Sequence, residues 1–217
     1  MNSAIILAGG DGNRINSSVP KQFIEINNKK LIDFSIDAFE KNKNIDEIII
    51  VLNKKWIEKY KDEYKSYILT VGGNSRSHSS LNGLLCCSEK SKNVLIHDAA
   101  RPLLSQDLIN NCIKYLSTYI AATPFIDISD SLIEKNNNKI KYINRDLIKK
   151  IQTPQAFNTD VIKEALKIID NYGKDDISTL LNHNSSANIK FFKGSKNNFK
   201  ITNDNDLKIL EYIINEK

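Results

Sequence analysis

Short apolar runs alternate with stretches of helical periodicity along most of the chain. The runs consist mainly of Ile, Leu, Val and Ala, a composition typical of strands that are covered on both faces of a parallel sheet. The strands predicted in this way are residues 5–8, 47–52, 68–71, 94–97, 119–125 and 189–192. The fifth of these strands is expected to end at Pro124.

Amphipathic stretches separate these runs. The predicted helices are residues 31–41, 79–87, 108–116, 161–170, 177–181 and 206–214, with a helix or a helical loop over residues 56–67. Because strand, helix and strand in this order form a right-handed βαβ unit, the pattern predicts an α/β fold. We expect a single domain over residues 1–217, with a Rossmann-like, mostly parallel twisted sheet and flanking helices.

Residues 126–151 break this pattern. A short alternation of polar and apolar residues on both sides of a turn at 136–139 predicts a β-arm, a hairpin that projects from the sheet. The apolar face of such an arm must be buried, and a second subunit would cover it. We therefore expect a homodimer, and we expect residues 152–157, which follow the arm, to form a loop.

Polar or glycine-rich segments follow three of the predicted strands. Residues 9–14 read Gly-Gly-Asp-Gly-Asn-Arg, residues 72–76 read Gly-Gly-Asn-Ser-Arg, and residues 98–101 read Asp-Ala-Ala-Arg. In open α/β sheets, ligands bind outside the carboxyl ends of the strands. The three segments are therefore expected to meet at one site.

The first segment is suited to binding an anion. Gly9, Gly10 and Gly12 allow a tight turn that brings backbone N–H groups close to a phosphate, with Arg14 at its end and Lys21 a few residues later. The spacing is neither that of a dinucleotide fingerprint nor that of a Walker loop. The pattern therefore excludes a Rossmann dehydrogenase and a P-loop enzyme.

Composition narrows the class of protein further. The net charge of +5 comes from 31 Lys and Arg against 26 Asp and Glu, without a basic block, which favours small anionic substrates over nucleic acid. The Asn- and Lys-rich residues 27–30 are interpreted as a solvated loop without a function. Three cysteines, an odd number, argue against a disulfide scaffold. With no leader pattern and no apolar run of about 18 residues, we expect a cytoplasmic protein without a membrane partner.

The chain resembles the nucleotidyltransferases with a glycosyltransferase-A-like α/β fold, and within them the 2-C-methyl-D-erythritol 4-phosphate cytidylyltransferases of isoprenoid synthesis. Collinear segments from one end of the chain to the other carry this resemblance: residues 7–14, 20–23, 72–76, 97–102, 152–155 and 200–202. The ribitol phosphate cytidylyltransferases share nearly all of them.

The resemblance implies a transfer of CMP from CTP to 2-C-methyl-D-erythritol 4-phosphate with release of pyrophosphate. Because no covalent enzyme intermediate is needed, the protein must position two anions and neutralise charge at the transition state. The resemblance gives this catalytic role to Arg14, Lys21 and Lys200. It also implies a Mg²⁺ ion that is held mainly by CTP phosphates and water.

The resemblance also divides the remaining site residues between the two substrates. The nucleotide is expected to bind the first and second loops, at Ala8, Gly9, Gly10, Gly12, Gly73, Asn74 and Ser79. A larger side chain at Gly73 would keep a pyrimidine out. The acceptor is expected to bind Asp98, Arg101, Ser131, Arg145 and Thr153, with Arg145 reaching from the arm into the neighbouring subunit's site.

Two departures from the family pattern lie on the acceptor side. Lys174 stands where the family has a threonine whose hydroxyl is assigned to the acceptor phosphate, so an ammonium group replaces that hydroxyl. The family's Asp-Thr pair on the arm matches Asp130-Ser131, or Asp127-Ile128 with a different gap. The sequence thus supports CTP as the donor better than it identifies the acceptor alcohol.

Several alternatives follow from the same residues. Within the enzyme class, the acceptor could be ribitol 5-phosphate or another polyol phosphate for cell-surface polymers. A catalytically silent nucleotide-binding protein is the alternative from another class, and the intact Arg14, Lys21 and Lys200 argue against it. His97, at the end of a buried strand, is interpreted as a hydrogen-bonded structural histidine.

Overall fold

The computed structural model describes residues 1–10, 15, 17, 19–137, 139–168 and 174–216. Within these residues, one sheet contains eight strands, in the order β10-β7-β11-β6-β1-β4-β5, with β12 paired to β7. The strands are β1 (Asn2–Ala8), β4 (Glu47–Leu52), β5 (Ile68–Val71), β6 (Asn93–Asp98), β7 (Ala121–Asp127), β10 (Lys149–Ile151), β11 (Gln155–Asn158) and β12 (Ile189–Lys193). The pairs among β5, β4, β1 and β6 are parallel, as is the pair of β7 with β12.

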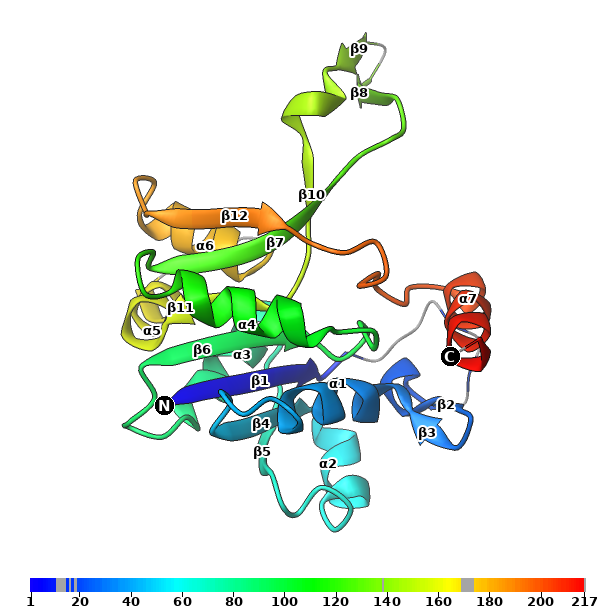
Figure 1. Cartoon of the computed structure of the whole chain (residues 1–217), viewed down its shortest axis with the longest axis vertical. Coiled ribbons are helices and arrows are strands. Elements are labelled where there is room, and N and C mark those ends of the chain that lie inside the picture. The colour runs from blue at the N-terminus through cyan, green and yellow to red at the C-terminus, as the bar shows by residue number, and fades with distance from the viewer. Residues whose placement is uncertain (11–14, 16, 18, 138, 169–173, 217) are drawn as a thin grey trace.

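Helices cover both faces of this sheet (Figure 1). The α-helices among the described residues are α1 (Leu31–Glu40), α2 (Lys54–Tyr60), α3 (Arg76–Leu85), α4 (Gln106–Tyr115), α5 (Thr159–Ile168), α6 (Asp176–His183) and α7 (Asp204–Asn215). Helix α7 lies beside the sheet (Figure 1) and packs in a separate cluster with Ile26 and Leu31. Side chains of α1 and α4 pack on one face, and side chains of α3, α5 and α6 pack on the other. The structure therefore confirms the α/β fold that the hydrophobic pattern predicts.

Strand β1 shows why the pattern has this form. Ala4 and Ile6 face the cluster that includes α1 and α4, whereas Ile5 between them faces the cluster that includes α3 and α5. All three side chains are fully buried. Because successive residues of a strand point to opposite faces, a strand with helices on both sides is apolar at every position.

Two local predictions were wrong. Strand β7 does not end at Pro124 but continues to Asp127, because β10 pairs with Phe125, Ile126 and Asp127, and the Pro124 carbonyl accepts a bond from the N–H of Gln152 at 2.8 Å. The predicted loop over residues 152–157 contains β11, which pairs with both β6 and β7. The stretch of residues 56–67, predicted as a helix or a helical loop, belongs to α2 up to Tyr60 and continues as hydrogen-bonded turns, in which the N–H of Tyr64 donates to the carbonyl of Tyr60 at 3.0 Å.

Residues 27–30, interpreted as a solvated loop, belong to a small hairpin of β2 (Glu25–Ile26) and β3 (Lys29–Lys30). Asn27 and Asn28 form its two-residue turn, with φ of 52° and 60°. Asparagine tolerates this left-handed conformation better than most residues, and such turns match the twist of the paired strands.

The predicted arm is present. Strand β8 (Leu132–Asn136) and strand β9 (Lys139–Ile143) pair in a hairpin that stands clear of the sheet (Figure 1). The short helix η2 (Arg145–Leu147) leads back from it to β10. On the arm, Ile140, Tyr142 and Leu147 are 63%, 78% and 78% exposed. Among the described residues, no helix could span a membrane.

Candidate functional site

A cavity of about 670 Å³ lies at the carboxyl ends of the parallel strands. Its walls are formed by residues that follow β1, β4, β5 and β6, and by two lysines from opposite ends of the sequence, Lys21 and Lys200. This volume is in the range of cavities that bind small molecules and cofactors. The three segments that the sequence places at strand ends therefore meet at one site, as predicted.

A second cavity of about 160 Å³ adjoins the first. The two share Arg76, Asp98 and Lys200 as lining residues, so these three side chains form the wall between them. The second cavity is also lined by Arg101 after β6 and by Lys174 and Asp175 just before α6. Its other lining residues lie between the end of β10 and the start of β11: Ile151, Gln152, Thr153 and Gln155.

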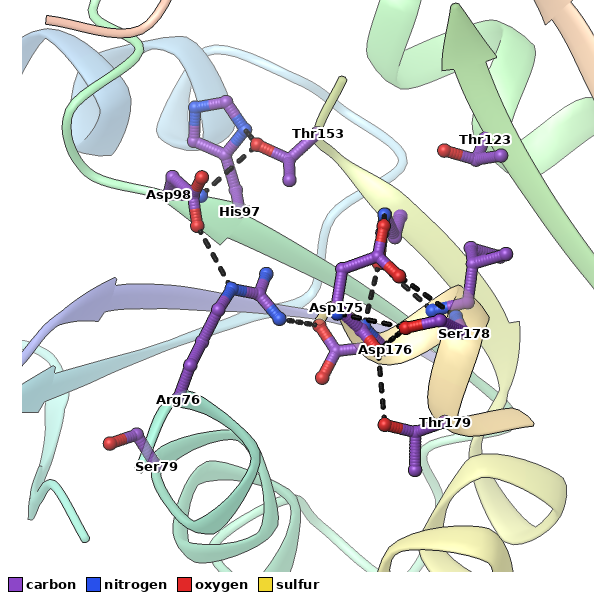
Figure 2. Close-up of polar contacts among 12 residues, drawn as sticks. Arg76, Ser79, His97, Asp98, Thr123, Thr153, Asp175, Asp176, Ser178 and Thr179 are labelled. Carbon is purple, nitrogen blue, oxygen red and sulfur yellow. Dashed lines mark hydrogen bonds and ion pairs between the residues drawn. The ribbon is translucent and has the colours of Figure 1, made fainter. Parts of the chain in front are cut away.

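Asp98 is the centre of the charged groups at this wall, and Figure 2 shows its contact with Arg76. One of its carboxylate oxygens accepts a bond from Lys200 Nζ at 2.8 Å and lies 3.7 Å from Arg101 Nε, and the other lies 3.3 Å from Arg76 Nε. Burial alone would raise the pKa of Asp98, but the charges of Arg76, Lys200 and Arg101 outweigh it and hold this pKa far below its usual range. Asp98 is therefore a permanent anion that orients three cations.

Arg76 extends this arrangement to helix α6. Its Nη1 atom lies 2.5 Å from Oδ2 of Asp176, a residue with no exposed surface (Figure 2). Ser75 caps the first turn of α3 by accepting the N–H of His78, which fixes the start of the helix that carries Arg76. The start of α6 is held in turn by Gln155, whose Oε1 accepts the N–H groups of Asp176 and Ile177, each at 3.1 Å. Asp176 at the start of α6 thus belongs to the site through its contact with Arg76, in addition to the favourable interaction of a carboxylate with a helix N-terminus.

A chain of hydrogen bonds through His97 fixes the third segment. The N–H of Asp98 donates to Thr153 Oγ1, which lies 3.1 Å from His97 Nδ1, and His97 Nε2 lies 3.1 Å from the Arg101 carbonyl. Since that carbonyl can only accept, Nε2 donates and Nδ1 accepts from the threonine hydroxyl. Burial lowers the pKa of His97 to about 4, so the ring is neutral. The structural role expected for His97 is confirmed.

Gly73, Asn74 and Ser79 are the residues of the second segment that are expected to bind the nucleotide, and the hydroxyl of Ser79 fixes the backbone of this segment. Ser79 Oγ accepts the N–H of Gly73 at 3.1 Å and donates to the carbonyl of Ser75 at 3.0 Å. A Cβ atom at Gly73 would lie 2.3 Å from His78 Cβ. The glycine is therefore required by packing against the first turn of α3, a reason that differs from the expected exclusion of a pyrimidine.

The expected catalytic lysines come together from the two ends of the chain. Lys21 Nζ donates to the carbonyl of Ile201 at 2.9 Å, and Ile201 directly follows Lys200. Both lysines line the first cavity, together with Ala8, Gly9, Gly10, Gly73, Asn74 and Ser79. The remaining two expected residues, Gly12 and Arg14, lie outside the described residues.

The acceptor residues divide into two groups. Asp98, Arg101 and Thr153 line the second cavity, although the Thr153 hydroxyl is already bonded to His97 and Asp98. Ser131 and Arg145 lie on the exposed arm, and neither is among the lining residues of the two cavities in the described chain. Arg145 there donates to the carbonyl of Ser129.

Among the described residues, no group of three or more His, Cys, Asp or Glu side chains could hold a metal ion. The carboxylate at the wall between the cavities, Asp98, is engaged by Lys200, Arg76 and Arg101. These residues therefore do not fit a Mg²⁺ ion held by the protein.

The structure adds residues to which the sequence assigned no role. Gln22 and Asn53 line the first cavity, and Arg76 lines both cavities. Asn53 directly follows strand β4, so its position at a strand end is a signal that could have identified it. Gln22 and Arg76 lie inside segments that carry the resemblance, but their partners are distant in sequence.

Comparisons with known proteins identify the family of this chain. The profile of the family described as 2-C-methyl-D-erythritol 4-phosphate cytidylyltransferase matches residues 2–216. A protein of that name from Clostridium botulinum is 36% identical over 224 residues, covering 98% of this chain and 97% of the relative. One from Thermotoga neapolitana is 35% identical over 221 residues, covering 100% and 98%.

Solved structures give the same result. The crystal structure described as 4-diphosphocytidyl-2C-methyl-D-erythritol synthase from Anaerococcus prevotii superposes with a TM-score of 0.86 at 28% identity, covering 99% of this chain and 96% of that one. Sequence and fold therefore agree, and the chain belongs to the 2-C-methyl-D-erythritol 4-phosphate cytidylyltransferase family.

Proposed function

We propose that this chain transfers CMP from CTP to 2-C-methyl-D-erythritol 4-phosphate and releases pyrophosphate. The observation that carries the proposal is the wall shared by the two cavities, where Arg76, Asp98 and Lys200 border the larger cavity on one side and the smaller on the other. The larger cavity accommodates the nucleotide, and the smaller one the phosphorylated acceptor. The reacting atoms then meet at the shared wall.

The charges at this wall suit an attack by one phosphate on another. The acceptor phosphate has a second pKa of about 6, so near neutral pH its oxygen is a nucleophile without a general base. A bond forms from this oxygen to the α-phosphorus of CTP, the bond to the β-phosphate breaks, and pyrophosphate leaves. Asp98 is not needed as a base, because the attacking phosphate oxygen is already ionised and the low pKa of Asp98 makes it a weak proton acceptor. Its carboxylate instead holds Lys200, Arg76 and Arg101 in place.

Two lysines, Lys200 and Lys21, supply positive charge to the phosphates in this proposal. Lys200 lines both cavities, and Lys21 lines the nucleotide cavity at the carbonyl of Ile201. Positive charge that is already in position stabilises the charge developing on the phosphates without reorganisation. Mg²⁺ stays a prediction, as an ion that arrives on the CTP phosphates and neutralises part of their charge.

A homodimer completes the proposed site. The exposed apolar residues Ile140, Tyr142 and Leu147 give the arm a surface that a second copy would cover. In such a dimer, Arg145 and Ser131 would approach the acceptor cavity of the neighbouring subunit. We also expect the reaction to take place in the cytoplasm, since Cys86, Cys87 and Cys112 are free thiols.

The test is pyrophosphate release by the purified chain with CTP and a panel of acceptors. We expect release with 2-C-methyl-D-erythritol 4-phosphate, and none when the phosphate of that acceptor is removed. Release with ribitol 5-phosphate alone would replace the acceptor in the proposal. CTP binding without release for any acceptor would overturn the enzymatic function.

A further inference from the structure

We infer that Gln22 is a positioning residue that sets the conformation of the glycine turn after β1. The inference rests on the proposed function, because it assigns the turn to the triphosphate of CTP. Gln22 is 3% exposed, lines the nucleotide cavity and directly follows Lys21.

The contacts of Gln22 point to this role. Its side-chain amide nitrogen donates two hydrogen bonds, one to the carbonyl of Ala8 at 2.7 Å and one to the carbonyl of Gly10 at 2.9 Å. The carbonyl between them, that of Gly9, accepts from Asn53 Nδ2 at 3.4 Å. Three consecutive carbonyl groups of the turn are thus bonded to two side-chain amides.

The geometry of the peptide group explains why these hydrogen bonds make the turn favour an anion. In a planar trans peptide, the carbonyl of one residue and the N–H of the next point in opposite directions. Bonds from Gln22 to Ala8 O and from Asn53 to Gly9 O therefore direct the N–H groups of Gly9 and Gly10 away from these donors. Successive N–H groups presented in this way form an anion site, whereas carbonyl groups released toward a triphosphate would repel it.

The backbone of Gln22 is itself well anchored. It lies in the short helix η1 (Lys21–Phe23), where the N–H of Phe23 donates to the carbonyl of Pro20 at 2.9 Å. The buried ring of Phe23 stacks on Tyr60 of α2, with ring centroids 3.9 Å apart. One short helix therefore positions both the amide that holds the turn and the lysine proposed to act on the α-phosphate.

The chemistry of the position requires a neutral amide. Glutamine provides two N–H donors on one nitrogen, which matches the two carbonyl acceptors. Glutamate has the same shape but would place a negative charge beside two carbonyl oxygens and the triphosphate. Methionine has a similar volume and donates nothing. Gln22→Met and Gln22→Glu therefore test the donors without a large change of packing.

The matched control is Asn42, a buried amide at 4% exposure that is absent from the lining of both cavities in the described chain. Its Nδ2 also donates two bonds, to Gln106 Oε1 at 2.8 Å and to Asn110 Oδ1 at 3.0 Å. Asn42→Leu thus removes two donated bonds, as Gln22→Met does, together with one that Asn42 Oδ1 accepts from the N–H of Asn44 at 3.0 Å, at a site that the proposed function does not use.

The experiment measures the Kd of CTP and of cytidine by calorimetry for the whole chain and each variant, with KM and kcat for the folded variants. Gln22→Met and Gln22→Glu are expected to weaken CTP binding by about tenfold or more, a factor that corresponds to about 1.4 kcal/mol. Cytidine binding should change much less, because cytidine has no phosphate. Asn42→Leu should leave both affinities near those of the unmodified chain.

Equal losses for CTP and cytidine in the Gln22 variants would overturn the inference, as would unchanged CTP affinity or an equal loss in Asn42→Leu. If the Gln22 variants do not fold, the Gln22→Asn chain replaces them, since it keeps the donors but shortens their reach, and the same comparison of CTP with cytidine decides. Failure of the unmodified chain to bind CTP would instead contradict the proposed function.

Discussion

Asp98 shows how single residues of this site constrain one another. Its carboxylate contacts Arg76, Arg101 and Lys200, and its N–H contacts Thr153. Arg76, Arg101 and Lys200 outnumber the two buried carboxylates that they contact, Asp98 and Asp176, which leaves a net positive charge at the wall of the two cavities. Such a surface attracts both substrates, which carry phosphate groups. The carboxylate of Asp98 offsets the mutual repulsion of the three cations.

Lys21 gives the most direct test at this scale. Lys21→Ala should lower kcat by about 10²- to 10³-fold, the range found when one preorganised group that stabilises the transition state is removed. The thermal unfolding midpoint should change little, since the lysine lines a cavity. Lys43→Ala, which removes an exposed lysine outside the cavity lining, is the control. Retention of full activity by Lys21→Ala would show that another group acts on the α-phosphate.

His97 predicts a pH dependence of stability. Its pKa is lowered by burial to about 4, whereas an unfolded histidine titrates near 6.5. Between these values the unfolded chain binds a proton that the folded chain does not, so stability falls as pH falls from about 6.5 to about 4. The free energy of unfolding that depends on the neutral form of His97 is fully present above pH 6.5. The loss of this free energy by pH 4 is on the order of 3 kcal/mol.

Urea unfolding at several pH values between 4 and 7.5 measures this effect. The His97→Gln chain should be less stable at neutral pH, because it disturbs the bonds to Thr153 and Arg101. Its free energy of unfolding should nevertheless fall less steeply as pH decreases. Equal slopes for both chains would show that other groups cause the pH dependence.

Residue types predicted some of the site and missed the rest for a physical reason. Lys21 could be identified because it follows a glycine-rich segment at a strand end and matches the family pattern, whereas Lys200 was identified by the family resemblance. Gln22 and Asp176 could not, because their partners lie 12 to 14 and 100 residues away in sequence. A neutral amide or a helix-starting aspartate has the same local pattern whether or not it contacts a site.

At the scale of elements, the link between α3 and α6 joins two residues of the site that lie 100 positions apart in sequence. Arg76 at the start of α3 joins Asp98 of β6 to Asp176 of α6. Asp176→Ala would leave the Arg76 guanidinium without one of its two carboxylates and should cost about 3 kcal/mol of unfolding free energy, since removal of one partner of a buried pair is costly. Arg76 is partly exposed, so the low end of the usual range applies.

A double-mutant cycle isolates this contribution. The free energy of unfolding is measured in urea for Asp176→Ala, Arg76→Gln and the chain with both changes. If the two charges stabilise the fold through each other, the double variant should lose less stability than the two single losses added together. Additive losses would assign the effect of Asp176→Ala to the helix start alone.

Elements with a long, regular pattern were predictable, and the short paired ones were not. The buried strands β1, β4 and β6 and the amphipathic α1 show their periodicity over many residues. Strand β11 has only Ala156 and Phe157 between two polar residues, and its identity depends on pairing with β6 and β7. Such a segment has no preference that is visible before the sheet exists.

At the scale of the whole molecule, the arm separates residues that the site is expected to use. Arg145 and Ser131 are far in the fold from the wall formed by Asp98 and its cations, because the β8–β9 hairpin stands away from the sheet (Figure 1). The exposed Ile140 and Tyr142 give this arm an apolar surface. A contact between two copies would account for both observations.

Association through the arm has a measurable consequence. Tyr142→Lys places a charge on a side chain that is 78% exposed in the single chain, so it should disturb a dimer interface and leave the fold of each subunit intact. Sedimentation should then show a smaller particle with unchanged circular dichroism. An unchanged particle size would place any association surface elsewhere.

Subunit mixing decides whether Arg145 acts across such an interface. Arg145→Ala and Lys21→Ala chains are each expected to be nearly inactive. In a mixed dimer, one site combines the intact Lys21 of one chain with the intact Arg145 of the other, if the arm reaches across. Random exchange makes half of the dimers mixed, each with one complete site of two, so activity should recover to about a quarter of that of the unmodified chain. If Arg145 acts within its own chain, neither site of the mixed dimer is complete and the mixture stays inactive.

Repeating the mixture with Tyr142→Lys in both chains is the control, since chains that cannot associate should recover nothing.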